Sequence, residues 1–209
     1  MGRVVEPRRK ARGRRAAAGA AAAVARAGGS RRPVALRPAV EVEVQRVAGA
    51  WAPPARRIAG WVEAALGRRG VGAAVAVRVV GAAEGRRLNH GWRRKDHATN
   101  VLSFPAAPWL AGAPRSQAAR EPQPLGDLGI CAPVLAREAR EQGKTRLAHW
   151  AHLVVHGSLH LAGFDHEHEL DARRMERRER RVLAGLGFPD PYASPPLRRR
   201  ATMPRRGAR

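Results

Sequence analysis

Three histidines in one short segment could bind a divalent metal ion. Residues 156–166 have the sequence HGSLHLAGFDH. In a helix, residues four apart lie on the same face, so His156 and His160 can point at one ion. Gly163 suits the left-handed turn that ends a helix, and His166 can then return to the same ion. Three neutral imidazoles leave zinc an open coordination position. The sequence therefore predicts one catalytic Zn2+ per chain, at the C-terminal end of a helix.

The residue after the first histidine argues against a zinc protease. In the H-E-x-x-H motif a glutamate directly follows the first histidine and acts as general base. Here that position is Gly157, so peptide hydrolysis by that mechanism lacks its base. Asp165 has three open roles, because it could orient a ligand imidazole, accept a proton or cap a turn.

The remaining histidines are predicted to have supporting roles. His152 lies four residues before His156 and shares its helix face, so it is expected to pack or hydrogen-bond nearby. A fourth ligand is the alternative for His152. His149 and His168 are predicted to be surface residues or hydrogen-bond partners of the ligands.

A basic segment at residues 88–105 is predicted to bind RNA. Three consecutive cations follow Trp92, and Arg93 is the first of them. The planar fork of a guanidinium matches phosphate oxygens, and Trp92 could stack on an unpaired base. The alternative is a solvated helix end, where cations interact favourably with the helix dipole. Asp96 is expected to pin an arginine or cap the turn.

Composition and charge favour a polyanionic partner. The chain has 209 residues, enough for one domain with a core, and a net charge of +23. Lysine and arginine displace counterions at phosphates, although an Arg/Ala-biased genome would also enrich arginine on solvated surfaces. The single cysteine, Cys131, excludes an intrachain disulfide and fits a reducing compartment. No apolar run approaches the ~20 residues that span a bilayer, so we expect a cytoplasmic protein without membrane contact.

The domain is predicted to lie between two basic tails. Residues 1–38 are Arg/Ala-rich and of low complexity, which favours a disordered tail or a mis-assigned start codon. A transit peptide is the third interpretation and is ranked below these two. Residues 39–192 are predicted to form the folded domain, with residues 106–124 as a surface loop. Residues 193–209 are predicted to be a second disordered basic tail.

Hydrophobic periodicity predicts an α+β fold with one small sheet. Strands are expected near Val40 and at residues 71–80, 101–104 and 125–130, with Pro105 ending the third. Helices are expected at residues 53–66, 82–92, 133–142, 145–162 and 167–183. The last helix has sparse apolar anchors, namely Leu170, Met175, Val182 and Leu183. Strands concentrate early in the chain and helices late, which is typical of the α+β class.

Four ordered blocks between Val40 and Tyr192 resemble the YbeY family of bacterial endoribonucleases, also called rRNA maturation factors. The first block has L-N at 88–89, W-R at 92–93, K-D at 95–96 and T-N-V-L-S-F-P at 99–105. The second has L-G-D at 125–127 and I-C at 130–131. The third is His152 with V-H-G-S-L-H-L at 155–161 and G-F-D-H at 163–166. The fourth has M-E at 175–176, L-G at 186–187 and P-D-P-Y at 189–192.

The resemblance implies a single-strand-specific, metal-dependent endoribonuclease. It implies action in 16S rRNA 3′-end maturation and ribosome quality control, with single-stranded rRNA and the small ribosomal subunit as partners. It also implies a four-stranded sheet, with zinc held by His156, His160 and His166 at the mouth of a basic cleft. Arg93 falls on the family's functionally important arginine.

The departures from the family pattern are few. Trp92 and Phe164 stand where tyrosine is common, and His97-Ala98 replaces a Lys-Pro-like pair. The alternative to a nuclease is a ribosome-binding or rRNA-binding assembly factor with a structural zinc and little nuclease activity. A fourth ligand, such as His152, would favour that alternative.

Overall fold

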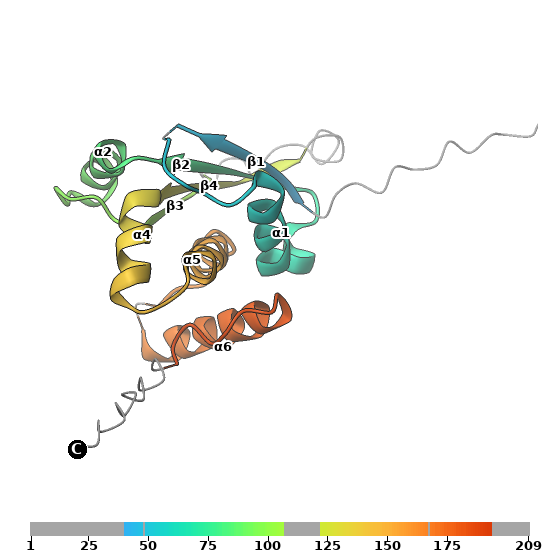
Figure 1. Cartoon of the computed structure of the whole chain (residues 1–209). Coiled ribbons are helices and arrows are strands. Elements are labelled where there is room, and N and C mark those ends of the chain that lie inside the picture. The colour runs from blue at the N-terminus through green and yellow to red at the C-terminus, as the bar shows by residue number, and fades with distance from the viewer. Residues whose placement is uncertain (1–39, 48, 107–121, 167, 194–209) are drawn as a thin grey trace, which may run out of the picture. The chain divides into compact units, whose positions relative to one another are not determined.

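The fold is a mixed four-stranded sheet with helices, as the α+β prediction required (Figure 1). The computed structural model describes residues 40–47, 49–106, 122–166 and 168–193. The predicted basic tails, except Ala193, and most of the predicted loop at 106–124 lie outside these residues. No helix in the described ranges is long and apolar enough to cross a membrane.

The sheet has the strand order β1-β2-β4-β3. Its strands are β1 (Val40–Arg46), β2 (Ala73–Val80), β3 (Val101–Pro105) and β4 (Gln123–Cys131). The β1–β2 and β2–β4 pairs are parallel, and the β3–β4 pair is antiparallel. Parallel neighbours need a crossover, which α1 (Ala55–Leu66) and the 3-10 helix η1 (Gly67–Gly70) provide between β1 and β2. In this strand order β3 is an outer strand, because among the described strands it pairs only with β4.

Three predicted strands have other bounds in the structure. The second strand begins at Ala73, not residue 71, because η1 and Gly72, with φ +75°, come first. Strand β3 continues through Pro105, since an outer strand tolerates a residue without an N–H. Strand β4 includes Gln123 and Pro124, which had been predicted to belong to the surface loop.

Helix α5 (Arg146–Leu161) lies at the centre of the helical layer (Figure 1). It contacts β3 and β4, and it also contacts α1, α4 (Ala132–Glu141) and α6 (Glu169–Gly185). Trp150 and Val154 of α5 are almost completely buried. Helix α2 (Ala82–Arg93) lies at the end of the sheet where β2 and β4 finish, and it contacts β4 and α4.

The apolar positions of α6 fix how it packs. Met175, Val182 and Leu183 are buried, which confirms three of the four predicted anchors. Leu170 is 76% exposed, so the fourth prediction was wrong. Met175 is five positions after Leu170, which places the two side chains about 140° apart around the helix. The first turn of α6 therefore turns Leu170 toward solvent.

Gly157 allows α5 to lie directly on the sheet. A Cβ at this position would stand 2.9 Å from Leu128 Cδ2 and 3.2 Å from Val101 Cγ2. The Gly157 carbonyl also accepts a hydrogen bond from Ser103 Oγ at 3.2 Å. The position that carries the glutamate base in H-E-x-x-H proteases thus faces the sheet, where a large side chain has no room.

We expect Gly157→Ala to lower the free energy of unfolding by about 1–3 kcal/mol, the usual cost of overpacking a core. Gly60→Ala is the matched control, because Gly60 is inside α1 and a Cβ there meets nothing within 4 Å. The control should gain roughly 0.5–1 kcal/mol from better helix propensity. Urea unfolding of both variants measures the difference, and equal effects would contradict the packing described.

Candidate metal centre and basic surface

The structure brings His156, His160 and His166 together. Their possible ligand atoms all lie within 4.8 Å of one another. The ring centroids of His156 and His160 are 4.7 Å apart, and those of His160 and His166 are 4.8 Å apart. The first two rings come from the last turns of α5. Gly163 has φ +83°, the left-handed turn expected from the sequence, and it returns the chain so that His166 faces the pair.

The protonation of His160 suits a metal ligand. Burial, together with the nearby His156 and His166, lowers its pKa to about 4. At neutral pH the imidazole is therefore uncharged and has one nitrogen with a bare lone pair. Zinc takes neutral imidazoles at ~2.0–2.1 Å. The donor set and its protonation thus fit one divalent ion.

Glu179 of α6 lies behind the histidine cluster and is fully buried. Its Oε1 is 2.8 Å from His156 Nδ1, and its Oε2 is 3.2 Å from His152 Nε2. The Tyr192 hydroxyl donates a further hydrogen bond to Oε2. His152 therefore hydrogen-bonds beside the cluster, as one of its two predicted roles required.

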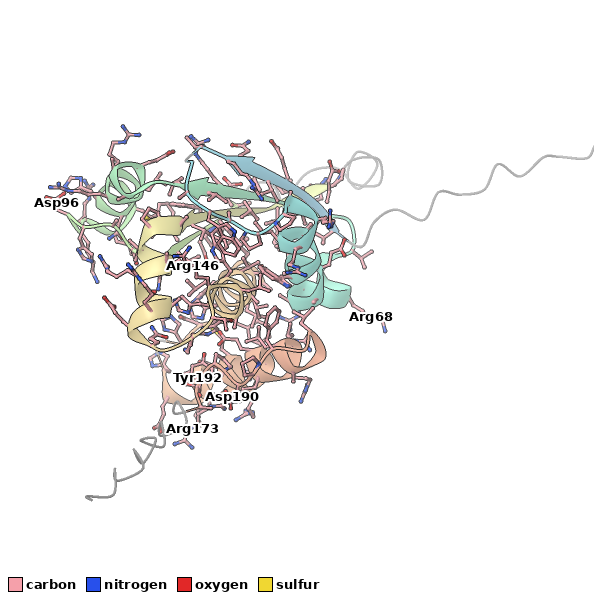
Figure 2. All side chains as sticks on the ribbon, viewed as in Figure 1. Arg68, Asp96, Arg146, Arg173, Asp190 and Tyr192 are labelled. Carbon is pink, nitrogen blue, oxygen red and sulfur yellow. The ribbon has the colours of Figure 1, made fainter. Side chains whose placement is uncertain are left out.

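Glu179 is ionised despite its burial. Burial alone would raise the pKa of its carboxyl group, but the hydrogen bonds from His152, His156 and Tyr192 outweigh burial and lower it to about 2. Burial, followed by the contact with Glu179, raises the pKa of Tyr192, so its hydroxyl keeps its proton. Figure 2 shows Tyr192 beside α6, at the end of the described chain.

A second carboxylate, Glu138 of α4, holds His149. The Glu138 Oε2 atom is 3.1 Å from His149 Nε2 and accepts a hydrogen bond from Asn100 Nδ2 at 2.9 Å. His149 is only 2% exposed, so its prediction as a surface residue was wrong. It lies on the buried side of α5, where α4 packs.

Burial of His149 should make folding depend on pH. Burial outweighs the hydrogen bond that His149 makes to Glu138 and lowers the pKa of His149 below its ordinary 6.5. Between the lowered pKa of the folded state and the ordinary pKa of the unfolded state, the unfolded chain binds a proton that the folded chain does not. His149 therefore costs no stability well above pH 6.5, and the free energy of unfolding falls as the pH drops below that, by up to ~1.4 kcal/mol per pH unit for one proton.

His149→Gln tests this pH dependence, because it removes the titrating group and keeps a polar side chain beside Glu138. Urea unfolding of metal-free protein from pH 7.5 to 5 should give a shallower slope of unfolding free energy for His149→Gln. Equal slopes for the parent and the variant would contradict the assignment.

The turn that carries the third histidine adjoins a small hollow. Asp165 Oδ1 accepts a hydrogen bond from the His166 N–H at 2.6 Å, which is the turn-capping contact among its predicted roles. The hollow measures about 200 Å3, and its lining includes Phe164, Arg69 and Arg174. The Arg69 guanidinium lies 4.8 Å over the Phe164 ring and donates to the Ala162 carbonyl. Two guanidinium groups and the carboxylates of Asp165 and Asp171 therefore line this hollow.

Arg93 is exposed and is the last residue of α2. Within the described ranges its guanidinium has no ion-pair or hydrogen-bond partner. Arg94 caps the helix in the left-handed conformation, with φ 58°. The cations thus stand at a helix C-terminus, which agrees with the dipole alternative and leaves the groups accessible. Asp96 pairs with Arg86 at 2.6 Å, as its predicted role of pinning an arginine required, and this hydrogen bond lowers the pKa of Asp96.

The structure does not place Arg93 among the histidines. Ser103 of β3 hydrogen-bonds α5, whereas the next residue, Phe104, packs against Trp92 of α2 with ring centroids 5.0 Å apart. Successive strand residues face opposite sides of a sheet. The α2 terminus and α5 therefore lie on opposite faces, with the outer strand β3 between them. Trp92 remains 56% exposed.

The two carboxylates that hold histidines were not predicted from the sequence. Glu179 lies four residues after Met175 and three before Val182, on the buried face of α6. Glu138 similarly lies between the buried Leu135 and Ala139. A charged residue at an apolar helical position beside a histidine-rich helix was the signal that could have identified both.

Comparison with known proteins identifies the family. The family model described as Endoribonuclease YbeY matches residues 53–187, which include the three histidines and Arg93. The chain belongs to the endoribonuclease YbeY family. Family members are similar to it over most of their length.

Two relatives named Endoribonuclease YbeY illustrate this similarity. The protein of Alkalilimnicola ehrlichii is 58% identical over 163 residues, 74% of this chain and 92% of the relative. The protein of Halorhodospira halophila is 51% identical over 153 residues, 73% of this chain and 96% of the relative. A solution structure of a Thermotoga maritima protein has a TM-score of 0.45 and 22% identity, and covers 73% of this chain and 99% of that one.

Proposed function

We propose that this chain is a zinc-dependent endoribonuclease that cleaves single-stranded RNA. Its proposed task is 16S rRNA 3′-end maturation and ribosome quality control, in the cytoplasm, with the small ribosomal subunit as partner. The observation that carries the proposal is the convergence of three histidines in a member of the endoribonuclease YbeY family. The names of its relatives favour a nuclease over an assembly factor without activity.

The three histidines would hold the ion, and the residues around them would hold RNA. A bound zinc ion would polarise a phosphoryl oxygen and acidify a water molecule. Arg69 and Arg174 flank the hollow next to His166, where a phosphate of the substrate could be bound. The neutral imidazole of His160 carries no charge that repels the ion. Gly157 faces the sheet, so no side chain at that position takes part.

Arg93 would bind a second phosphate of the same RNA strand. The strand would pass around the outer strand β3, with its cleaved bond at the histidines and a neighbouring nucleotide at the α2 terminus. Trp92 is exposed there and could stack on an unpaired base. A duplex is too stiff to follow this sharp path, which supports the preference for single strands.

The assembly-factor alternative would have His152 complete a closed zinc site. In the structure the Nε2 atom of His152 hydrogen-bonds Glu179 instead. His152 is also absent from the group of ligand atoms formed by the other three histidines. These contacts support an open coordination position, and hence a catalytic ion.

A cleavage assay with labelled RNA tests the proposed function. The purified protein should cut a single-stranded RNA, leave the duplex of the same sequence largely intact, lose activity after a chelator and regain it with zinc. If the protein binds the single-stranded RNA and the duplex but cleaves neither, with or without added zinc, the assembly-factor alternative would be supported instead.

A further inference from the structure

We propose that Glu179 is a positioning residue for the metal ligand His156. Its carboxylate accepts a hydrogen bond from the Nδ1–H group of His156. This contact fixes the tautomer in which the lone pair of Nε2 is free to bind the ion. This inference rests on the proposed function for the identity of the ion. The contacts that carry it are nevertheless visible without any metal.

The first step is the tautomer. Glu179 Oε2 already accepts the hydrogen bond of Tyr192 and faces His152, and Oε1 lies 2.8 Å from His156 Nδ1, a hydrogen-bond length, so we assign the proton of this contact to Nδ1. A neutral imidazole has one proton, so Nε2 is then the atom with a free lone pair. Carboxylates that hold metal-binding histidines in this way also orient the ring and raise its basicity.

The second step is the rigidity of the carboxylate. His152 and Tyr192 both donate to Oε2, which leaves Oε1 for His156. His152 Nδ1 is buried and has no hydrogen-bond partner in the described structure, as expected when Nε2 carries its proton. Glu179 is itself fully buried in the packing of α6 on α5. Three donors and this packing therefore hold the group that orients His156.

A second metal site was the competing interpretation. His152, His156 and Glu179 also place possible ligand atoms within 4.8 Å of one another. However, the separations of 2.8 Å and 3.2 Å are hydrogen-bond lengths, and Tyr192 supplies a further donor. An ion there would have to displace these protons. The contacts thus fit a support for the first site.

The control is a carboxylate that holds another histidine of α5. Glu138 also holds a histidine of α5 through its Nε2 atom, with a separation of 3.1 Å. Its histidine, His149, lies seven residues before His156, about 10 Å farther along the helix. Glu138 therefore matches Glu179 in chemistry but does not contact a proposed ligand.

Glu179→Gln and Glu138→Gln should separate positioning from stability. An amide can accept from or donate to Nδ1, so the variant at Glu179 no longer fixes the tautomer. We expect its zinc affinity, measured by competition with a chromophoric chelator, to fall ~10–100-fold. Glu138→Gln should stay within about threefold of the parent. Zinc affinity of folded Glu179→Gln equal to that of the parent would overturn the proposal.

Nitrogen NMR of the metal-free parent tests the proposal without any substitution, should Glu179→Gln fail to fold. The expected spectrum shows His156 protonated at Nδ1 near pH 7.5, and Nε2 protonation would overturn the proposal. Failure of the parent to bind zinc would contradict the proposed function alone, because the tautomer is measured without metal.

Discussion

His160→Ala should lose both the zinc ion and RNA cleavage. His160 is the central ring of the cluster, with its centroid 4.7 Å from that of His156 and 4.8 Å from that of His166. Removing it leaves two ligands, too few for a protein zinc site. The loss of affinity should exceed the ~10–100-fold that follows removal of an outer hydrogen-bond partner. Elemental analysis after dialysis and cleavage of labelled single-stranded RNA measure the two effects.

His168→Ala is the matched control for this experiment. His168 is exposed and lies two residues beyond His166, outside the cluster. The control should retain zinc and cleavage. Added zinc should raise the melting temperature of the parent and of His168→Ala, but not that of His160→Ala, because binding stabilises only a fold with a complete site. Retention of about one zinc by His160→Ala would contradict the assigned ligand set.

Arg93→Ala should weaken RNA cleavage without changing the metal content. Its guanidinium is accessible at the end of α2 and is proposed to bind a phosphate beyond β3. A hydrogen bond to a charged group contributes ~1.5–3 kcal/mol, so kcat/KM should fall about 10–100-fold. Zinc should remain because no histidine of the cluster contacts α2. Kinetics on a labelled single-stranded RNA, with zinc determined on the same sample, test both expectations.

Arg137→Ala serves as the charge-matched control. Arg137 is an exposed arginine of α4 that pairs with Glu141 at 3.6 Å, and its removal changes the net charge equally. A similar loss of activity in both variants would indicate general electrostatic attraction and contradict a specific role of Arg93. A loss of zinc in Arg93→Ala would show that the residue supports the fold of the site.

The geometry of the histidines could be predicted because it depends on local chain geometry. The spacing of His156 and His160 requires only a helix, and Gly163 requires only a left-handed turn, with φ +83° in the structure. The apolar stripe of α1 was likewise predicted, and Ile58, Trp61 and Leu66 are buried. These features depend on contacts or conformations within a few residues of each other.

The support of the site could not be predicted in the same way because it depends on packing between distant segments. Glu179 reaches His156 across 23 positions, and only the packing of α6 on α5 brings them together. The position of Arg93 relative to the histidines similarly depends on which face of the sheet α2 covers. Hydrophobic periodicity assigns a residue to a buried face but does not identify the element that covers it.

The most direct test of the account is zinc content and RNA cleavage measured on one preparation of the purified protein. The account predicts about one zinc per chain, and cleavage of single-stranded RNA that disappears and returns with the metal. A folded protein that cuts RNA equally well without metal, or that binds no zinc at all, would contradict the account.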